Sequence, residues 1–251
     1  DSFTRDGNEV VVEAGALYRP YTVQGRNSGP VAMIFRDNII SDKLAFAYSG
    51  LSGAAAADDF INRVYNVCGR LQGQDAAAES PGPHLVTIIV DGENPWENYD
   101  NDGRDFLHAL YQRLSDDPHI VTVTPSEFLE LAPDRPRLRN LWAGSWHNSD
   151  FATWIGEEEE NRAWELLAEA RTYLQTYISG GNREAVTPEQ LEAALVQMYI
   201  AEGSDWFWWY GADRDSGDDG AFDQQFRNTL KSVYTALGVE PPLELDIPII
   251  P

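Results

Sequence analysis

The sequence predicts an α/β fold in which parallel strands alternate with crossover helices, followed by a part made of helices. Continuous apolar runs at residues 31–35 and 84–90 are typical of strands buried on both faces of a sheet. A helical pattern at residues 105–114 separates the second run from another expected strand at 120–123. This alternation indicates a parallel sheet. Beyond residue 138 the apolar spacing becomes helical.

Strands and connections are expected before the first long helix. Residues 10–12 are a short β-prone run, and residues 18–21 form a turn or an extended segment because Pro20 disfavours helix at the residue before it. A further short apolar run follows at 44–48. Residues 54–71 then show helical spacing of apolar side chains, and a short helix is expected to start near Thr124.

A connection rich in Pro and Arg at residues 132–139 divides the chain into two expected domains, 1–137 and 138–251. The three helices expected in the second domain cover residues 157–177, 188–200 and 224–237. The second of them has Thr187 as its N-cap and a proline in its first turn, which is where proline fits a helix.

Charge and composition exclude several classes of partner. The net charge of −23 and the pI near 4.3 predict repulsion from phosphate backbones and anionic lipid headgroups, so neither nucleic acid nor membrane is expected. Neutral sugars meet no such barrier. The single cysteine, Cys68, excludes an internal disulfide, slightly favours a reducing, cytoplasmic compartment, and is predicted to be a buried core residue.

The first candidate site follows residues 84–90, where the sequence changes to Asp91-Gly-Glu-Asn-Pro-Trp-Glu. Ligands of α/β folds bind at the carboxyl ends of strands, where this stretch is expected to lie. Asp91 and Glu93 are two nearby carboxylates, a pattern suited to general acid catalysis, and Trp96 offers a ring that stacks on a sugar. The alternative is a structural turn in which Asp91 caps the next element.

The second candidate site is the aromatic stretch at residues 201–211, with three Trp, one Phe and one Tyr in succession. So many aromatic rings in a row are not all expected in a core. The tryptophans, Trp206, Trp208 and Trp209, can pack on the apolar faces of sugar rings, while Asp205 can bind hydroxyl groups. The alternative is an aromatic cluster between domains.

The third candidate is the stretch at residues 141–149, where Trp146 and His147 fit a binding loop and a structural turn equally well. His147 lacks a second metal ligand at a recognisable spacing, so neither a metal site nor a cofactor is expected. Acidic residues at 213–219 break the spacing of a calcium loop and are interpreted as a solvated loop. Those at 157–160 are interpreted as the first turn of a helix, where they complement its dipole.

Together, these motifs resemble glycoside hydrolase family 57, in its amylopullulanase and α-amylase-like branch. The stretches that carry the resemblance are Asp91-Gly-Glu-Asn-Pro-Trp-Glu-Asn-Tyr, Asn101-Asp-Gly-Arg-Asp-Phe-Leu, Gly144-Ser-Trp, Thr153-Trp-Ile-Gly and Ala201-Glu-Gly-Ser-Asp-Trp-Phe-Trp-Trp-Tyr-Gly, with Phe35-Arg-Asp and Ser41-Asp upstream. The resemblance implies the C-terminal portion of an incomplete (β/α)7 barrel with parallel strands, followed by a helical region. It also implies a retaining enzyme that hydrolyses or transfers α-glucans.

The resemblance assigns the acid/base role to Asp91, with Glu93 as its charged neighbour, and places Asp205 and residues 206–209 along the substrate cleft. The His-Gln-Pro motif and the glutamate motif that supplies the nucleophile have no counterpart in this sequence. We therefore expect an α-glucan substrate. Three explanations stay open for the absent motifs: the chain is a fragment, its N-terminal half is a separate polypeptide, or it is a degenerate relative. The expected partner is that N-terminal half or a second copy. An unpaired strand edge near Val31 would need such a cover. The alternative is a non-catalytic carbohydrate-binding or assembly module.

Overall fold

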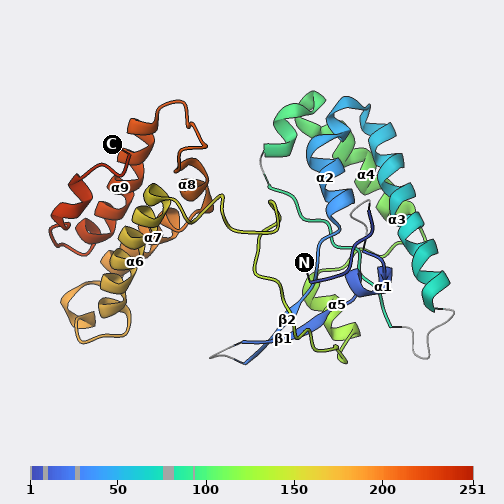
Figure 1. Ribbon diagram of the computed structural model, residues 1–251, viewed down its shortest axis with the longest axis horizontal. Helices are drawn as coiled ribbons and strands as arrows, with labels where there is room; N and C mark the ends of the chain where they lie inside the picture. The colour runs from blue at the N-terminus through green and yellow to red at the C-terminus, as the bar shows by residue number, and fades with distance from the viewer. Residues whose placement is uncertain (1, 8–10, 26–28, 76–81, 93, 251) are drawn as a thin grey trace. The chain divides into compact units, whose positions relative to one another are not determined.

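The structure is a computed structural model that describes residues 2–7, 11–25, 29–75, 82–92 and 94–250 (Figure 1). The chain forms two compact units, Asp1–Trp142 and Ala143–Pro251. The division falls after Trp142, whereas the sequence places the domain boundary at residue 137. Among the described residues, no helix has the length and apolar character needed to cross a bilayer.

Unit 1 is built mainly of helices. Its helices and strands are α1 (Ala14–Leu17), β1 (Tyr21–Gln24), β2 (Pro30–Met33), α2 (Asn38–Phe46), α3 (Gly53–Asp75), α4 (Arg104–Asp116) and α5 (Pro125–Leu131). Short 3-10 turns lie at Tyr48–Gly50, Asn94–Asn98 and Asp100–Gly103. The three predicted helices are confirmed as α3, α4 and α5. The last begins at a capping box, in which the Thr124 side chain and the Glu127 side chain satisfy each other's backbone N–H groups.

The strands of unit 1 differ from the prediction. In its described part, the named strands β1 and β2 form one antiparallel pair, with Tyr21 opposite Met33. Residues 31–35 are therefore not a strand buried on both faces, and Val31 is 53% exposed. The reason is local: the run pairs with the strand just before it, and the resulting two-stranded ribbon leaves most of its surface in solvent.

Residues 84–90 and 120–123 are not assigned as strands. Among the described residues, the first segment makes one isolated parallel bridge, between Arg36 and Thr87, and one backbone hydrogen bond from Leu85 to Tyr18. A second parallel bridge joins Thr22 to Arg137. Each contact involves one or two backbone hydrogen bonds, too few to build a ladder. The incomplete parallel barrel therefore remains a prediction, and the observed fold is α-rich with a two-stranded sheet.

Helix α2 replaces part of the extended run expected at residues 44–48. Asp37 is its N-cap, and the Asp37 side chain accepts a hydrogen bond of 2.9 Å from the backbone N–H of Ile40. The helix continues to Phe46, and a 3-10 turn follows at Tyr48–Gly50. The expectation of strand-like structure here is wrong because a good cap precedes nine residues that tolerate helix.

The core of unit 1 lies where α3 packs against α4, with Phe60, Phe106 and Leu110 buried. Cys68 is exposed, so the prediction of a buried cysteine is wrong. Helix α3 turns Phe60 and Val67 inward, and the residue after Val67 is rotated by about 100° around the helix axis. That rotation carries the Cys68 thiol out of the interface.

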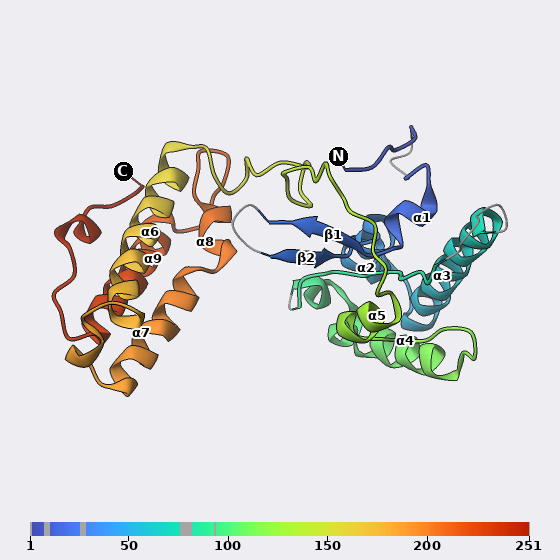
Figure 2. The same cartoon turned by 90° about the horizontal axis from the view of Figure 1, so that it is seen from below.

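Unit 2 is a helical bundle, and Figure 2 shows its three long helices together. They are α6 (Glu158–Ile178), α7 (Pro188–Ala201) and α9 (Asp219–Ala236). A 3-10 turn at Arg183–Ala185 lies between α6 and α7, the short α8 (Ser204–Trp209) lies between α7 and α9, and a further 3-10 turn at Leu243–Asp246 follows α9. The three predicted helices are confirmed, including the Thr187 cap of α7, whose hydroxyl accepts from the Gln190 N–H. Leu174, Met198 and Leu230 are buried in the bundle.

Candidate functional site

Asp91 lies at the C-terminal end of the extended segment 84–90 and is exposed, as is Gly92. One hydrogen bond closes the loop that follows, and a second ties the loop to the body of unit 1. The indole N–H of Trp96 donates to the Gly92 carbonyl at 2.9 Å, and the Tyr99 hydroxyl donates to the Leu44 carbonyl at 2.5 Å. Burial raises the pKa of Tyr99 to about 12, so this donor keeps its proton at neutral pH. Glu93 lies outside the described residues.

A left-handed turn closes the same loop. Asn101, Asp102 and Gly103 have φ angles of 53°, 52° and 72°. Gly103 is required for a second reason, because a Cβ there would lie 2.6 Å from the Trp96 ring. Trp96 is half-buried and packs on Phe106 with 6.4 Å between ring centroids. Trp96 therefore packs between the loop and Phe106. Its role in substrate binding stays a prediction.

Residues 35–42 support the segment that carries Asp91. The backbone N–H of Asp37 donates to the Thr87 carbonyl at 2.8 Å, and the Ile89 N–H donates to the Ser41 hydroxyl at 3.2 Å. Arg36 forms an ion pair with Asp42. The stretch 35–42, which carries part of the family resemblance, therefore adjoins the segment that leads into Asp91. Sequence patterns do not predict this support from Asp37 and Ser41, because the two hydrogen bonds join residues far apart along the chain.

The aromatic stretch of unit 2 divides between the core and the surface. Trp206 is half-buried, packs on Phe226 with 5.5 Å between ring centroids, and donates its indole N–H to the Ile200 carbonyl at 2.8 Å. Phe207 is fully buried and stacks on Trp164 at 3.7 Å. These contacts place Trp206 mainly as a packing residue. Helix α8 is missed by the sequence prediction because six residues are too few to show a period.

Trp208 lies in a second cluster, here called the aromatic platform, formed by Trp146, His147, Trp154 and Trp208. The rings of Trp146 and Trp208 are nearly parallel, at 9°, with 6.3 Å between their centroids. Trp154 lies 5.5 Å from Trp208, and His147 also lies 5.5 Å from it. The guanidinium carbon of Arg214 lies 4.4 Å from the Trp208 ring centroid. Trp146 is 55% exposed, so the platform presents an indole to solvent.

The platform is held by a tight loop that brings two of the resembling stretches together. A Cβ on Gly144 would lie 2.1 Å from the Ser149 carbonyl oxygen, so only glycine fits there. The Thr153 hydroxyl and the His147 Nδ1 are 2.9 Å apart. The stretch at residues 141–149 is therefore a structural turn that also carries the exposed indole of Trp146.

The remaining predicted residues of unit 2 lie at the surface. Asp205 is exposed in the first turn of α8, and Trp209, at the end of that helix, is 36% exposed. The acidic start of α6 also binds the segment after α8. Glu157 accepts a hydrogen bond from the Ala212 N–H, and Glu159 accepts one from the Gly211 N–H. Within the described ranges, no group of three or more His, Cys, Asp or Glu side chains is placed to hold a metal ion.

Glu160 is a buried carboxyl whose ionisation is expected to lower the stability of unit 2. It is 1% exposed, and burial raises its pKa above the ordinary value of 4.5. Because the folded state holds the Glu160 proton more tightly than the unfolded state, this group stabilises the fold below pH 4.5. That stability is lost as the pH rises through the folded-state pKa, where Glu160 must ionise in a buried site. Glu160→Gln keeps the capping acceptor and removes that loss, so we expect a free energy of unfolding higher by at most about 1 kcal/mol at pH 7.

Urea unfolding at pH 7 and near pH 4.5 measures this difference, which should vanish at the lower pH. Glu158→Gln is the matched control, because Glu158 is exposed in the same turn. It should be unchanged or slightly less stable at pH 7. A Glu160→Gln variant that is less stable than wild type at pH 7 would show that ionised Glu160 stabilises the fold, contrary to this prediction.

Comparisons with known proteins bear on both units. The model of the family described as glycosyl hydrolase family 57 matches residues 1–139. Among solved structures, the chain is similar to that of a GH57 branching enzyme from the hyperthermophilic archaeon Thermococcus kodakaraensis, in complex with glucose and additives. The TM-score is 0.61 and the identity 18%, so this likeness concerns the fold alone. The similarity covers 88% of this chain and 46% of that chain, so the chain spans about half the length of the structure that it matches. No curated protein sequence gives a match.

Proposed function

Because the chain belongs to glycosyl hydrolase family 57, we propose that it forms part of a retaining enzyme acting on α-glucans, either a hydrolase or a glucanotransferase. One observation carries the proposal. Asp91 is exposed at the end of segment 84–90, in a loop fixed by Trp96 and Tyr99. A carboxyl that is fixed in place and open to solvent on one side can meet a glycosidic oxygen.

In the proposed mechanism Asp91 first donates its proton to the oxygen of the scissile bond, so that the leaving sugar departs as an alcohol. The resulting Asp91 carboxylate then takes a proton from water, for hydrolysis, or from an acceptor hydroxyl, for transfer. A retaining mechanism needs a second carboxylate about 5–5.5 Å away as nucleophile. Glu93 is proposed as the charged neighbour of Asp91.

We propose that the nucleophile comes from polypeptide outside these 251 residues. The glutamates that precede Asp91 in the sequence, Glu9, Glu13 and Glu79, do not stand in the sequence context of the nucleophile motif. An N-terminal half, on the same or a separate polypeptide, is the first candidate for its source, and a second copy of the chain is the other.

The aromatic platform is the proposed glucan-binding surface, with Trp209 and Asp205 beside it on α8. Trp146→Ala removes its exposed indole without opening the core, so we expect α-glucan binding to weaken by about tenfold, equal to about 1.4 kcal/mol, with little change in stability. Isothermal titration calorimetry with maltooligosaccharides measures the affinity. Trp142→Ala is the control, because Trp142 is 58% exposed and lies outside the platform. Equal weakening in both variants would contradict the assignment.

The second candidate function is a non-catalytic carbohydrate-binding or assembly module. The observation that favours it is that the platform presents its indole within unit 2, which does not contain Asp91. The two functions differ in one result. A complete protein that binds maltooligosaccharides but shows no Asp91-dependent turnover favours the module.

A further inference from the structure

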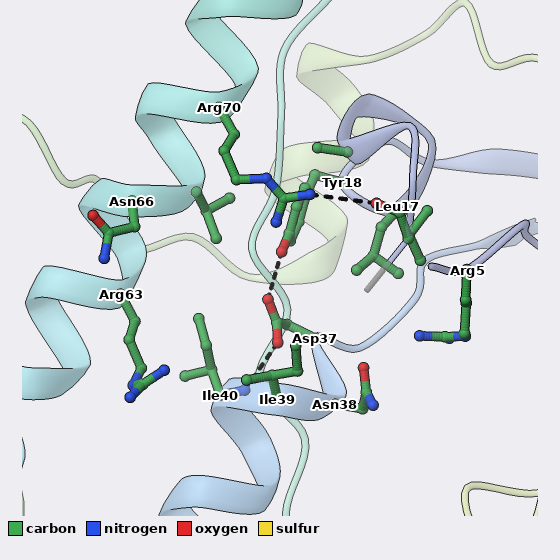
Figure 3. A pocket seen from close by; sticks show the side chains of 13 residues that line it. Arg5, Leu17, Tyr18, Asp37, Asn38, Ile39, Ile40, Arg63, Asn66 and Arg70 are labelled. Carbon is green, nitrogen blue, oxygen red and sulfur yellow. Dashed lines mark hydrogen bonds between the residues drawn. The ribbon is translucent and has the colours of Figure 1, made fainter. Parts of the chain in front are cut away.

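A pocket in unit 1 gathers positive charge in a strongly acidic protein. It has a volume of about 150 Å³ and lies between α3, the start of α2 and the N-terminal segment (Figure 3). Arg5, Arg63 and Arg70 line it. The whole chain has 18 Lys and Arg residues against 41 Asp and Glu, so three arginines around one small cavity are a local reversal of charge.

Helix α3 brings three of the polar lining residues to one face. Arg63, Asn66 and Arg70 follow the spacing i, i+3, i+7, which places them along one side of a helix. Figure 3 shows the three side chains on α3 and Arg5 approaching from the opposite side. The first turn of α2 contributes Asn38.

Arg63 and Arg70 are held in place by the protein itself. Arg63 donates from Nε to the Asp59 carboxylate at 2.6 Å, and Asp59 also accepts from the Tyr48 hydroxyl at 2.9 Å. Arg70 donates from Nη2 to the Val11 carbonyl at 3.3 Å. A guanidinium carries five N–H donors. Arg63 places two of them on Asp59 and Arg70 places one on the Val11 carbonyl, so both side chains retain donors for a ligand. Prior fixing reduces the entropy that binding must overcome.

Asp37 is the acidic group in the pocket lining, and it is already engaged. It is 4% exposed, accepts from the Tyr18 hydroxyl at 2.5 Å and caps α2 through the Ile40 N–H. Its negative charge and that of Asp59, which pairs with Arg63, oppose an incoming anion, and the three guanidinium groups exceed these two carboxylates by one charge.

We propose that this pocket, formed by Arg5, Arg63, Arg70 and the amides of Asn38 and Asn66, binds a small oxyanion. A guanidinium fork matches the paired oxygens of a phosphoryl or a carboxylate group. The volume corresponds to roughly five water molecules, below the range of pockets that enclose drug-sized ligands. The ligand is therefore a free anion or the charged end of a larger molecule.

The test is isothermal titration calorimetry of the whole chain at low ionic strength, with inorganic phosphate, acetate and glucose as probes. Phosphate or acetate should bind, and glucose should give no heat that depends on this pocket. Tighter binding of phosphate identifies a phosphoryl site, and binding of acetate at least as tight identifies a carboxylate site. Absence of binding by both anions overturns the proposal.

Two variants and one control locate the binding. Arg70→Gln and Asn66→Asp should each weaken anion binding by at least about tenfold. Asn66 is exposed, so its replacement leaves the core intact should Arg70→Gln fail to fold. Arg183→Gln removes an exposed arginine of unit 2 and should bind anions as wild type does. Wild-type affinity in Asn66→Asp would exclude this pocket as the site.

Discussion

Replacing Asp91 with Asn is expected to lower kcat on starch by about 10²–10⁴ in a complete enzyme that also supplies the nucleophile. Asparagine keeps the size of the side chain but cannot protonate the leaving oxygen or later accept a proton. Since the loop geometry stays the same, KM should change little, which is the pattern of a lost transition-state interaction. Initial rates on soluble starch and on pullulan measure both constants.

The matched control is Asp100→Asn, because Asp100 is an exposed carboxylate in the loop that follows. It should retain near wild-type kcat. A fall of similar size in both variants would indicate a general effect of charge in this loop and not an acid/base role.

Chemical rescue separates an acid/base residue from a nucleophile. In Asp91→Ala, an aryl α-glucoside with an activated leaving group can still form the glycosyl-enzyme, whose hydrolysis then lacks its base. Azide needs no base, so it should restore turnover and give the α-glycosyl azide, with retained configuration. A β-glycosyl azide would instead mark Asp91 as the nucleophile.

Removing Asp223 is expected to give the largest loss of stability, about 3–5 kcal/mol. Asp223 is 1% exposed and forms an ion pair with Arg227 at 2.9 Å within α9. It also accepts from the Tyr210 hydroxyl and from the Ile249 N–H, so it joins α9 to the C-terminal segment. Asp223→Ala leaves a buried guanidinium without its partner and two donors without an acceptor.

Urea unfolding followed by circular dichroism measures this loss in the whole chain. Asp246→Ala is the control, since it removes the exposed pair of Asp246, in the turn Leu243–Asp246, with Lys231 of α9 at 2.6 Å. That pair is expected to contribute no more than about 1 kcal/mol. Since a domain is stable by only about 5–15 kcal/mol, Asp223→Ala should unfold much of unit 2 at low urea. Equal, small effects in the two variants would contradict the role given to Asp223.

Helices were predictable from this sequence because their signals are local. Thr124 and Thr187 mark helix starts that the structure confirms, since a cap and a proline act within one turn. Strands were not predictable in the same way. The apolar runs at 31–35 and 84–90 have strand-like composition, but strand pairing depends on segments distant in sequence. The first forms a hairpin strand and the second makes one isolated bridge.

The candidate site shows a similar division. Composition predicts Asp91 and the tryptophans of α8 as candidate site residues. It does not predict which tryptophan faces the core and which faces solvent. The helix turns Trp206 towards the core and Trp208 into the platform, two residues apart in sequence. The supports of the site, such as Tyr99 and Gly103, were missed, because a hydrogen bond to Leu44 has no local sequence signal. The left-handed run before α4 did have one, in its Asn-Asp-Gly order.

We propose that this chain carries the acid/base carboxyl and obtains its nucleophile from elsewhere. The most direct test is reducing-sugar release from soluble starch and pullulan by the folded chain alone, by the chain with a nucleophile-bearing N-terminal half, and by each with Asp91→Asn. We predict no turnover by the chain alone and turnover on addition of the half, lost in the variant. Turnover by the chain alone that Asp91→Asn abolishes would contradict the claim, because the nucleophile would then lie within these 251 residues.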